Sequence, residues 1–247
     1  MKLIIENLSK AFAKKEVLAS ASFTFEKGII YALLGRNGSG KTTLFRLITD
    51  GLDKDSGEVF LEENGIKRKL EFKDIFFMVA EPELPKFLTG YEFIKFFIEA
   101  NKENIKSSKS IEEYFALVDF DIEDSHRLIQ GYSTGMKNKI QMLMFLILRP
   151  RVILMDEPLT SLDVVVQLEM KKIIREIHAD HIIIFSTHIL QLAKDICDEI
   201  VLLSDKKLQK VEENLIKNPD FEDKIITLLS GEGENIKIKE EVEAING

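Results

Sequence analysis

The chain of 247 residues has one cysteine, no long hydrophobic run and no excess of basic residues. Cys197 cannot form an internal disulfide, and its neighbours Ile196 and Ile200 are typical of an ordinary core thiol, so a reducing compartment fits. The longest apolar run, residues 142–148, is far shorter than the ~20 residues that span a bilayer. We therefore expect no membrane-spanning segment.

The charge balance excludes another class of function. The chain has 34 basic and 42 acidic residues and a formal net charge of −8, which argues against general nucleic-acid binding. The basic residues 67–69 follow Asn64-Gly65, a turn signal, and we interpret them as a solvated hairpin. The first residues, MKLIIE, lack the apolar region and cleavage site of a signal peptide.

The first third of the chain is predicted to be rich in strands. The 247 residues, 45% of them hydrophobic, suit one domain of generous size or one core with an inserted subdomain. Short runs rich in apolar or β-branched residues predict four strands within residues 1–82. These strands are expected at residues 3–8, 21–25, 29–34 and 58–62.

Helical patterns follow in residues 83–149. Thr89 to Glu92 and Ser110 to Glu113 both have the form of a capping box at a helix start. A third helix should start near Ser133 and run to about residue 148, because Pro150 makes continuation unfavourable. We interpret this segment as a helical insertion whose aromatic residues belong to the core.

The pattern then returns to alternating strand and helix. Buried strands are expected at residues 152–155 and 182–185, with a helix over residues 164–178 between them, which implies parallel strands joined by a crossover helix. Residues 1–82 and 150–230 would then form one α/β core, and residues 231–247 a charged tail without an assigned function.

The most informative motif is a glycine-rich loop between a predicted strand and a predicted helix. Its glycines let backbone N–H groups surround an anion. Lys41 can then reach the β- and γ-phosphates, and Thr42 can place its hydroxyl on Mg²⁺. The loop therefore predicts nucleoside triphosphate binding. Its candidate ligand-binding residues are Gly35, Arg36, Asn37, Gly38, Ser39, Gly40, Lys41, Thr42 and Thr43.

Two carboxylates end the strand predicted at residues 152–155. In open α/β sheets, ligands bind at the carboxyl ends of the strands. Asp156 is therefore suited to hold Mg²⁺, directly or through water, and Glu157 to orient an attacking water. An ordinary strand end with a solvated Asp-Glu pair is the alternative.

Three further segments complete a pattern. Tyr132 to Met136 starts the third predicted helix, residues 160–163 follow the carboxylate pair, and residues 186–188 end the last buried strand. In order and spacing, from about Leu3 to about Ser204, these five motifs resemble the ATP-binding subunits of ATP-binding cassette (ABC) transporters. The resemblance implies an α/β fold: a P-loop NTPase core of the ABC type with an N-terminal antiparallel β portion and an inserted helical subdomain.

The resemblance also implies roles for individual residues. Phe12 matches the aromatic residue that stacks on adenine, with a core phenylalanine as the alternative. His188 matches the switch histidine that contacts the γ-phosphate, and residues 35–43, Asp156 and Glu157 match the Walker A and Walker B motifs. The signature motif, which contacts ATP bound by the opposite subunit, is matched by Ser133, Thr134 and Gly135. The D-loop, which lines the dimer seam, is matched by Ser161, Leu162 and Asp163.

The chain departs from the family pattern in three places. Thr134 stands where many members have glycine and Met136 where many have glutamine, a form similar to export-type, ABC-2-like ATPases. Ala80 occupies the usual position of the Q-loop glutamine, so that either Glu81 substitutes or the contact with Mg²⁺ is weaker. His126, His178 and His181 match no motif, and we expect them at the surface; a zinc site is disfavoured with one lone cysteine.

The leading hypothesis is the ATPase subunit of a two-component exporter. It would bind ATP and Mg²⁺, form an ATP-dependent homodimer or heterodimer, and drive an integral membrane subunit at the cytoplasmic face of the membrane. A soluble ABC ATPase serving iron–sulfur assembly, chromosome structure or translation is the alternative. A small P-loop kinase or GTPase is a third class, which would need neither the signature helix nor the histidine.

Overall fold

A computed structural model describes residues 1–13, 15–105, 109–159, 162, 164–216, 218 and 220–230. The predicted tail, residues 231–247, lies outside the described residues, as do Ser161 and Asp163 of the predicted D-loop. Within these ranges, no helix is long and apolar enough to cross a lipid bilayer.

The N-terminal part of the chain forms an antiparallel sheet. The strands are β1 (Lys2–Phe12), β2 (Lys15–Glu26), β4 (Ser56–Glu63) and β5 (Ile66–Lys69), in the order β2-β1-β4-β5. The turn between β4 and β5 places Asn64 and Gly65 in the left-handed region, with φ of 53° and 78°, as a tight two-residue hairpin requires. The predicted hairpin is therefore confirmed.

A second sheet is mainly parallel. Its strands are β3 (Ile30–Leu34), β6 (Ile75–Met78), β7 (Val152–Asp156), β8 (Ile182–Thr187), β9 (Glu199–Ser204) and β10 (Lys207–Lys210), in the order β10-β9-β3-β8-β7-β6. Pairs from β9 to β6 are parallel, and β10 runs antiparallel to β9. The predicted crossover helix is α6 (Val164–Ile177), between β7 and β8.

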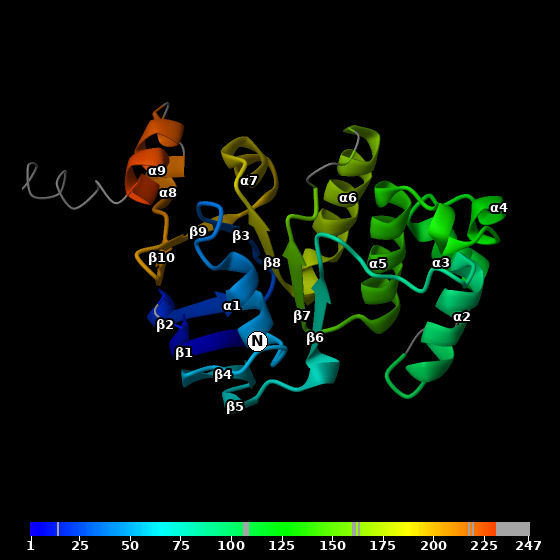
Figure 1. Cartoon of the computed structure of the whole chain (residues 1–247), viewed down its shortest axis with the longest axis horizontal. Helices are drawn as coiled ribbons and strands as arrows, with labels where there is room; N and C mark the ends of the chain where they lie inside the picture. Colours follow the sequence, from blue (N-terminus) through cyan, green and yellow to red (C-terminus); the bar gives the residue numbers. More distant parts are fainter. Residues whose placement is uncertain are drawn as a thin grey trace, which may run out of the picture.

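Helices gather beyond one edge of this sheet. Figure 1 shows α2 to α5 at one end of the molecule and the antiparallel sheet toward the other. Both predicted capping boxes are present, at Thr89 and Ser110, and Ser133 caps the third predicted helix by accepting a hydrogen bond from the Met136 amide. These helices are α2 (Gly90–Ala100), α3 (Ile111–Leu117), α4 (Ile122–Ser125) and α5 (Thr134–Leu148).

The remaining helices flank the parallel sheet or connect its strands. The α-helices are α1 (Lys41–Ile48), α7 (Leu190–Ile196), α8 (Glu213–Ile216) and α9 (Phe221–Ser230). The 3₁₀ turns are η1 (Phe72–Asp74), η2 (Ile129–Gly131) and η3 (His178–Asp180).

The core lies on both faces of the parallel sheet. Alternate residues of β8 point in opposite directions: Ile182 and Ile184 pack with the antiparallel sheet and α1, while Ile183 and Phe185 pack with the helices of the other layer. Strands covered on both faces read as continuous apolar runs, which explains why β7 and β8 are recognisable in the sequence. Packing on both faces therefore fixes the positions of the carboxyl ends of the parallel strands.

One expectation about the histidines is wrong. His181 directly precedes β8 and is 4% exposed. Its Nδ1 lies 2.5 Å from the Pro150 carbonyl oxygen, which gives the buried ring a hydrogen-bond partner. Burial lowers the pKa of its imidazole, so the ring is neutral at physiological pH. His126 is exposed and His178 partly exposed. A polar residue directly before a buried strand can therefore be a satisfied core residue.

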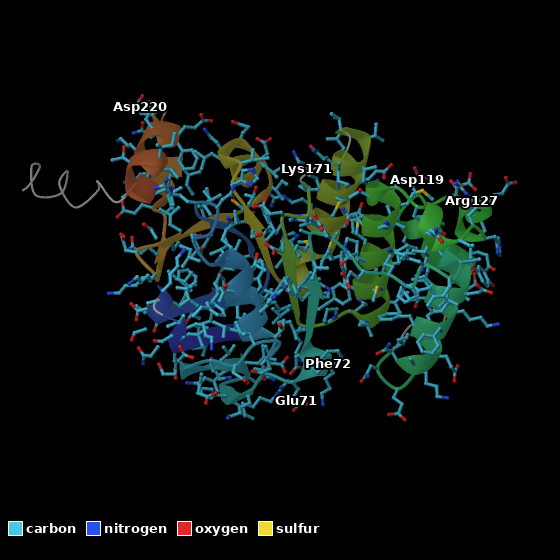
Figure 2. The ribbon with its side chains drawn as sticks, in the orientation of Figure 1. Glu71, Phe72, Asp119, Arg127, Lys171 and Asp220 are labelled. Atoms are coloured by element: carbon cyan, nitrogen blue, oxygen red, sulfur yellow. The ribbon has the colours of Figure 1, made fainter. Side chains whose placement is uncertain are left out.

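A buried carboxylate joins the two sheets. Asp74, at the end of η1, receives two hydrogen bonds from Arg68 of β5 and one from Arg151, which precedes β7. Figure 2 shows η1 at the lower edge of the molecule, where Glu71 and Phe72 point outward. Burial alone would raise the pKa of Asp74, but the hydrogen bonds from Arg68 and the Glu71 amide and the charge of both arginines outweigh it and hold that pKa below its ordinary 3.8.

Replacement of Asp74 by alanine should lower the free energy of unfolding by about 2 kcal/mol at pH 7, less than for a fully buried pair because water reaches both guanidinium groups. Since the folded-state pKa is depressed, this contribution is complete above pH 3.8 and is lost as the pH falls through the folded-state value. Urea titrations of wild type and variant at pH 7 and below 3.8 test this. Glu176→Ala, which removes an exposed ion pair with Lys172, is the control. A difference that does not shrink at low pH would contradict the assignment.

Candidate nucleotide-binding site

The predicted phosphate loop connects β3 to α1. Gly40 caps α1 with a φ of +109°, a conformation that favours glycine, and a Cβ there would also clash with Val17. At Gly35, a Cβ would lie 2.5 Å from Ser39 Oγ. Both positions therefore require glycine to keep the loop tightly wound at the start of a helix, where unpaired N–H groups favour an anion.

Lys41 is folded into the loop that it ends. Its Nζ donates to the Gly35 carbonyl oxygen at 2.8 Å and lies 3.8 Å from Glu157 Oε1, and the residue is 8% exposed. Burial lowers the pKa of the ammonium, whereas the charges of Glu157 and Asp156 oppose that shift. A desolvated cation is therefore placed where a phosphate would be most strongly attracted.

Asp156 links three elements at the carboxyl edge of the sheet. Its Oδ2 accepts a hydrogen bond of 2.6 Å from Thr42 Oγ1 on α1, and its Oδ1 accepts one of 2.5 Å from Ser186 Oγ on β8. The Ser186 hydroxyl in turn accepts from the Glu157 amide at 3.0 Å. Sequence reasoning did not single out Ser186 as a site residue, although a hydroxyl after an apolar strand is a usable signal.

Glu157 is brought together with two other candidate catalytic residues. Its Oε1 lies 3.0 Å from His188 Nδ1 and 3.8 Å from Lys41 Nζ. Glu157 has a φ of +48°, an uncommon conformation for this residue type that turns the chain sharply after β7. Lys41, Glu157 and His188 therefore meet although Lys41 and His188 are 147 positions apart in the sequence.

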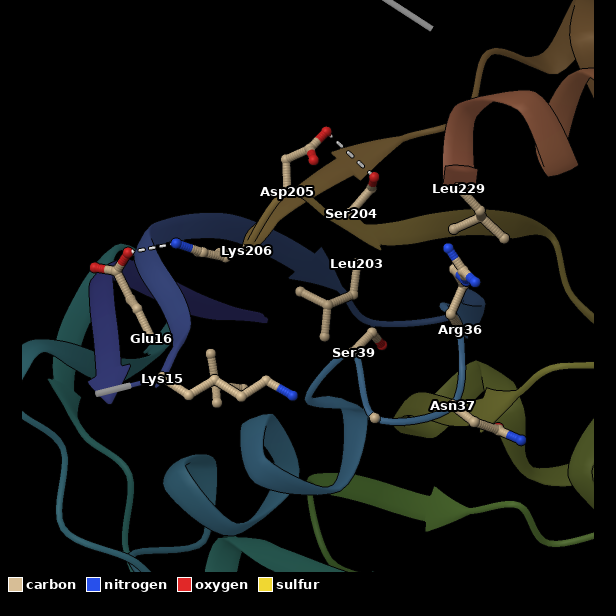
Figure 3. Close-up of a pocket in the computed structure, with 12 residues that line it drawn as sticks. Lys15, Glu16, Arg36, Asn37, Ser39, Leu203, Ser204, Asp205, Lys206 and Leu229 are labelled. Atoms are coloured by element: carbon tan, nitrogen blue, oxygen red, sulfur yellow. Dashed lines mark hydrogen bonds and ion pairs between the residues drawn. The ribbon is translucent and has the colours of Figure 1, made fainter. Parts of the chain in front are cut away.

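The loop borders a pocket of about 460 Å³. Figure 3 shows Arg36, Asn37 and Ser39 on one side, and Leu203 and Leu229 close by. Lys15 and Val17 of β2 also line the pocket. Phe12 does not line it; this residue lies at the tip of the β1–β2 hairpin, 45% exposed, with Lys10 Nζ 5.6 Å from its ring centre.

The predicted signature residues lie apart from the phosphate loop. Ser133 and Gly135 line a second pocket of about 220 Å³, together with Asp119, Asp121 and Lys139. Thr134 is exposed as the first residue of α5. The structure therefore does not bring the signature residues into the pocket of residues 36–39.

The other predicted segments are only partly described. Leu162 of the predicted D-loop is 9% exposed, and its carbonyl oxygen accepts from Gln167 Nε2 at 3.1 Å. Ala80 and Glu81 are both exposed just after β6. The loop that carries them starts at the same edge of the sheet as Asp156, because Met78 pairs with Met155.

The residues fit a bound phosphate chain and a hard cation. Ser39 Oγ is buried and has no hydrogen-bond partner among the described residues, so it can donate to a ligand oxygen. The hydroxyl of Thr42 and the carboxylate of Asp156 are neighbouring oxygen donors, and Mg²⁺ in nucleotide sites takes one or two such protein ligands besides the phosphates.

Comparisons with known proteins agree with this geometry. The family model described as "ABC transporter" matches residues 18–160. A Bacillus subtilis (strain 168) protein, the uncharacterized ABC transporter ATP-binding protein YxlF, is 29% identical over 83% of this chain and 69% of its own length. A probable sulfate/thiosulfate import ATP-binding protein CysA of Chlorella vulgaris is 31% identical over 85% of this chain and 91% of its own length.

Solved structures show the same fold. The structure of an ATP-binding subunit of an ABC transporter superposes with a TM-score of 0.77 at 22% identity, covering 93% of this chain and 100% of the other. The chain belongs to the ABC transporter ATP-binding family, a family of ATPases, and the expected fold class is confirmed.

Lys41→Ala should weaken ATP binding at least about a hundredfold, because the substitution removes charge-assisted hydrogen bonds worth about 1.5–3 kcal/mol each. Titration of purified protein with a fluorescent ATP analogue measures the effect. Lys54→Ala, which removes an exposed lysine bonded to Asp50, is the control and should bind normally. Micromolar affinity retained by Lys41→Ala would show that the loop is not the phosphate site.

Proposed function

We propose that this chain is the ATP-hydrolysing subunit of a two-component ABC exporter, working as a dimer at the cytoplasmic face of a membrane. The observation that carries the hydrolytic part is the convergence of Lys41, Glu157 and His188 beside Asp156. The export direction is supported by Tyr132 to Met136, whose form resembles that of export-type members.

Each residue in the cluster has a chemical task. Lys41 and the loop amides bind the β- and γ-phosphates, and Thr42 and Asp156 hold Mg²⁺, which supplies positive charge to the phosphates when bound. Glu157, whose carboxylate oxygens accept hydrogen bonds, positions the attacking water. His188 lies against Glu157 and, from there, contacts the γ-phosphate.

A dimer completes the site in this proposal. Ser133 lies at a helix start, where a hydroxyl and free amides suit an anion, yet it belongs to another pocket than the phosphate loop. In a head-to-tail pair, the signature of each subunit meets the ATP of the other. Hydrolysis then removes the γ-phosphate that joins the subunits, and the dimer opens.

The motion would be transmitted between a core and a subdomain. We propose that residues 1–82 and 150–230 together form the ATP-binding core, and that residues 83–149 form a helical subdomain that moves against it. Motion of the subdomain would reach an integral membrane subunit through the loop after β6. Phe12 is proposed to stack on adenine, because it is an exposed aromatic on the hairpin whose Lys15 and Val17 line the pocket.

The membrane partner separates this proposal from a soluble ABC ATPase. Gentle detergent extraction and affinity purification of the chain from its native cell, followed by mass spectrometry, should recover a polytopic membrane protein with it. Recovery of soluble partners alone would favour the alternative. The direction of transport is then measured with the complex in vesicles, where import of cargo would refute the exporter assignment.

Glu157→Gln should keep ATP binding and slow hydrolysis at least about a hundredfold, because the amide replaces one of the two acceptor oxygens that orient the water by a donor. The variant should accumulate as a closed dimer with ATP and Mg²⁺. Size-exclusion chromatography with and without nucleotide detects the change.

Glu176→Gln, on the exposed face of α6, is the matched control and should hydrolyse ATP like wild type. If Glu157→Gln elutes as a monomer with and without nucleotide, the proposed dimer with ATP between its subunits is contradicted. If the variant hydrolyses ATP at the wild-type rate, the role of Glu157 is contradicted.

Ala80→Gln should raise the ATPase rate of the isolated subunit about tenfold, because an alanine methyl cannot order the water or the metal and a glutamine amide can. Glu81→Ala should change the rate less than about twofold. Steady-state phosphate release at saturating ATP measures both. A hundredfold loss in Glu81→Ala, with no gain in Ala80→Gln, would show that Glu81 occupies the functional position of the loop.

A further inference from the structure

Gln141 is a buried amide whose partners lie in another element. It is 4% exposed in the middle of α5. Its Oε1 accepts a hydrogen bond from the Val79 amide at 3.1 Å, and its Nε2 donates to the Val79 carbonyl oxygen at 3.1 Å. The same Nε2 also donates to Asn138 Oδ1 at 3.3 Å. One side chain thus binds both backbone groups of a single residue, as a neighbouring strand would.

The position of β6 explains the need for this contact. β6 is the last strand of the parallel sheet, so one of its edges has no strand beside it within the described part of the chain. Backbone groups at such an edge need other partners when water is excluded. Gln141 supplies them at Val79, and one turn further along α5, Phe145 packs edge-on against Phe76 of β6, with 5.9 Å between ring centres. The helix is therefore fastened to β6 at two points.

The contact between Gln141 and Val79 lies between the end of β7, which carries Asp156, and the signature residues at the start of α5. Val79 follows Met78, which pairs with Met155, so the clamped residue is next to the strand end that carries Asp156. Ala80 and Glu81 come directly after it. At the other end, α5 begins after Ser133, about 12 Å from Gln141 along a regular helix. A shift of α5 must therefore be passed to the backbone beside Asp156.

We propose that Gln141 is a positioning residue for ATP hydrolysis: its amide holds the loop after β6 to the signature helix and sets where that loop meets the phosphates. This role rests on the proposed hydrolytic site. The measurement of dimer formation described below rests, in addition, on the proposed dimer with ATP bound between the subunits. Gln141 touches no reacting group. Its loss should slow turnover while nucleotide binding, which depends on residues 35–42, is maintained.

Gln141→Leu removes both hydrogen bonds to Val79 at similar volume, and Gln141→Glu replaces the Nε2 amide donor by a carboxyl oxygen. We expect both variants to lower kcat at least about tenfold and to change the Kd for ATP less than about threefold. Asn101→Ala, which loses an amide-to-backbone hydrogen bond at the end of α2, is the control for stability. Asn138→Ala leaves the two bonds to Val79 intact and should keep more than about half of the wild-type kcat.

The second measurement places Gln141→Leu in the Glu157→Gln background and follows the ATP-driven dimer by size-exclusion chromatography. A dimer that needs at least about tenfold more ATP supports coupling between α5 and the phosphate site. If Glu157→Gln alone stays monomeric, the sandwich fails, and the kcat arm still decides the role of Gln141.

Three results would overturn the proposal. The first is a wild-type kcat in the folded Gln141 variants. The second is an equal loss of kcat in Asn101→Ala at a matched melting temperature. The third is failure of both Gln141 variants to fold, which would make the amide a purely structural contact.

Discussion

The carboxylate of Asp156 is the interaction on which the site depends. Asp156 is 7% exposed, and a carboxylate buried to this extent without hydrogen bonds would destabilise the fold. The hydroxyls of Thr42 and Ser186 each donate a hydrogen bond to it. These two bonds fix the start of α1 and the end of β8 relative to β7. The Ser186 hydroxyl extends the arrangement to the Glu157 amide, so a single buried charge aligns the phosphate loop and the residue proposed to position water.

Local signals made much of this predictable from the sequence. The glycine spacing before Lys41, the capping boxes at Thr89 and Ser110, and the apolar runs of β7 and β8 each depend on neighbouring residues, and all are confirmed in the fold. Parallel pairing followed from the alternation of strands and helices. The roles of individual residues remain predictions, although the structure does bring Lys41, Glu157 and His188 together.

What the sequence did not reveal are contacts between distant residues. Ser186 meets Asp156 across 30 positions, and Gln141 meets Val79 across 62, and no spacing rule marks such pairs. His181 looked like a surface residue because burial of a polar ring depends on one carbonyl oxygen that the fold brings to it. The strands β6, β9 and β10 and the helices α7 and α9 were not predicted. The segments of β10 and α7 are short and lack caps or long apolar runs, whereas residues 200–203 of β9 form an apolar run like that of β7, a usable signal.

The place of α9 has a practical consequence for studying this protein. Leu229 lines the pocket next to Arg36, and the Leu228 carbonyl oxygen accepts a hydrogen bond from Ser204, so this helix forms one wall beside the phosphate loop. An attachment made directly after residue 230 would therefore start close to the pocket that the phosphate loop borders. Residue 1, whose backbone carbonyl accepts from the Lys27 amide, lies at the opposite end of β2 from the pocket residues Lys15 and Val17, so immobilisation there leaves that wall free.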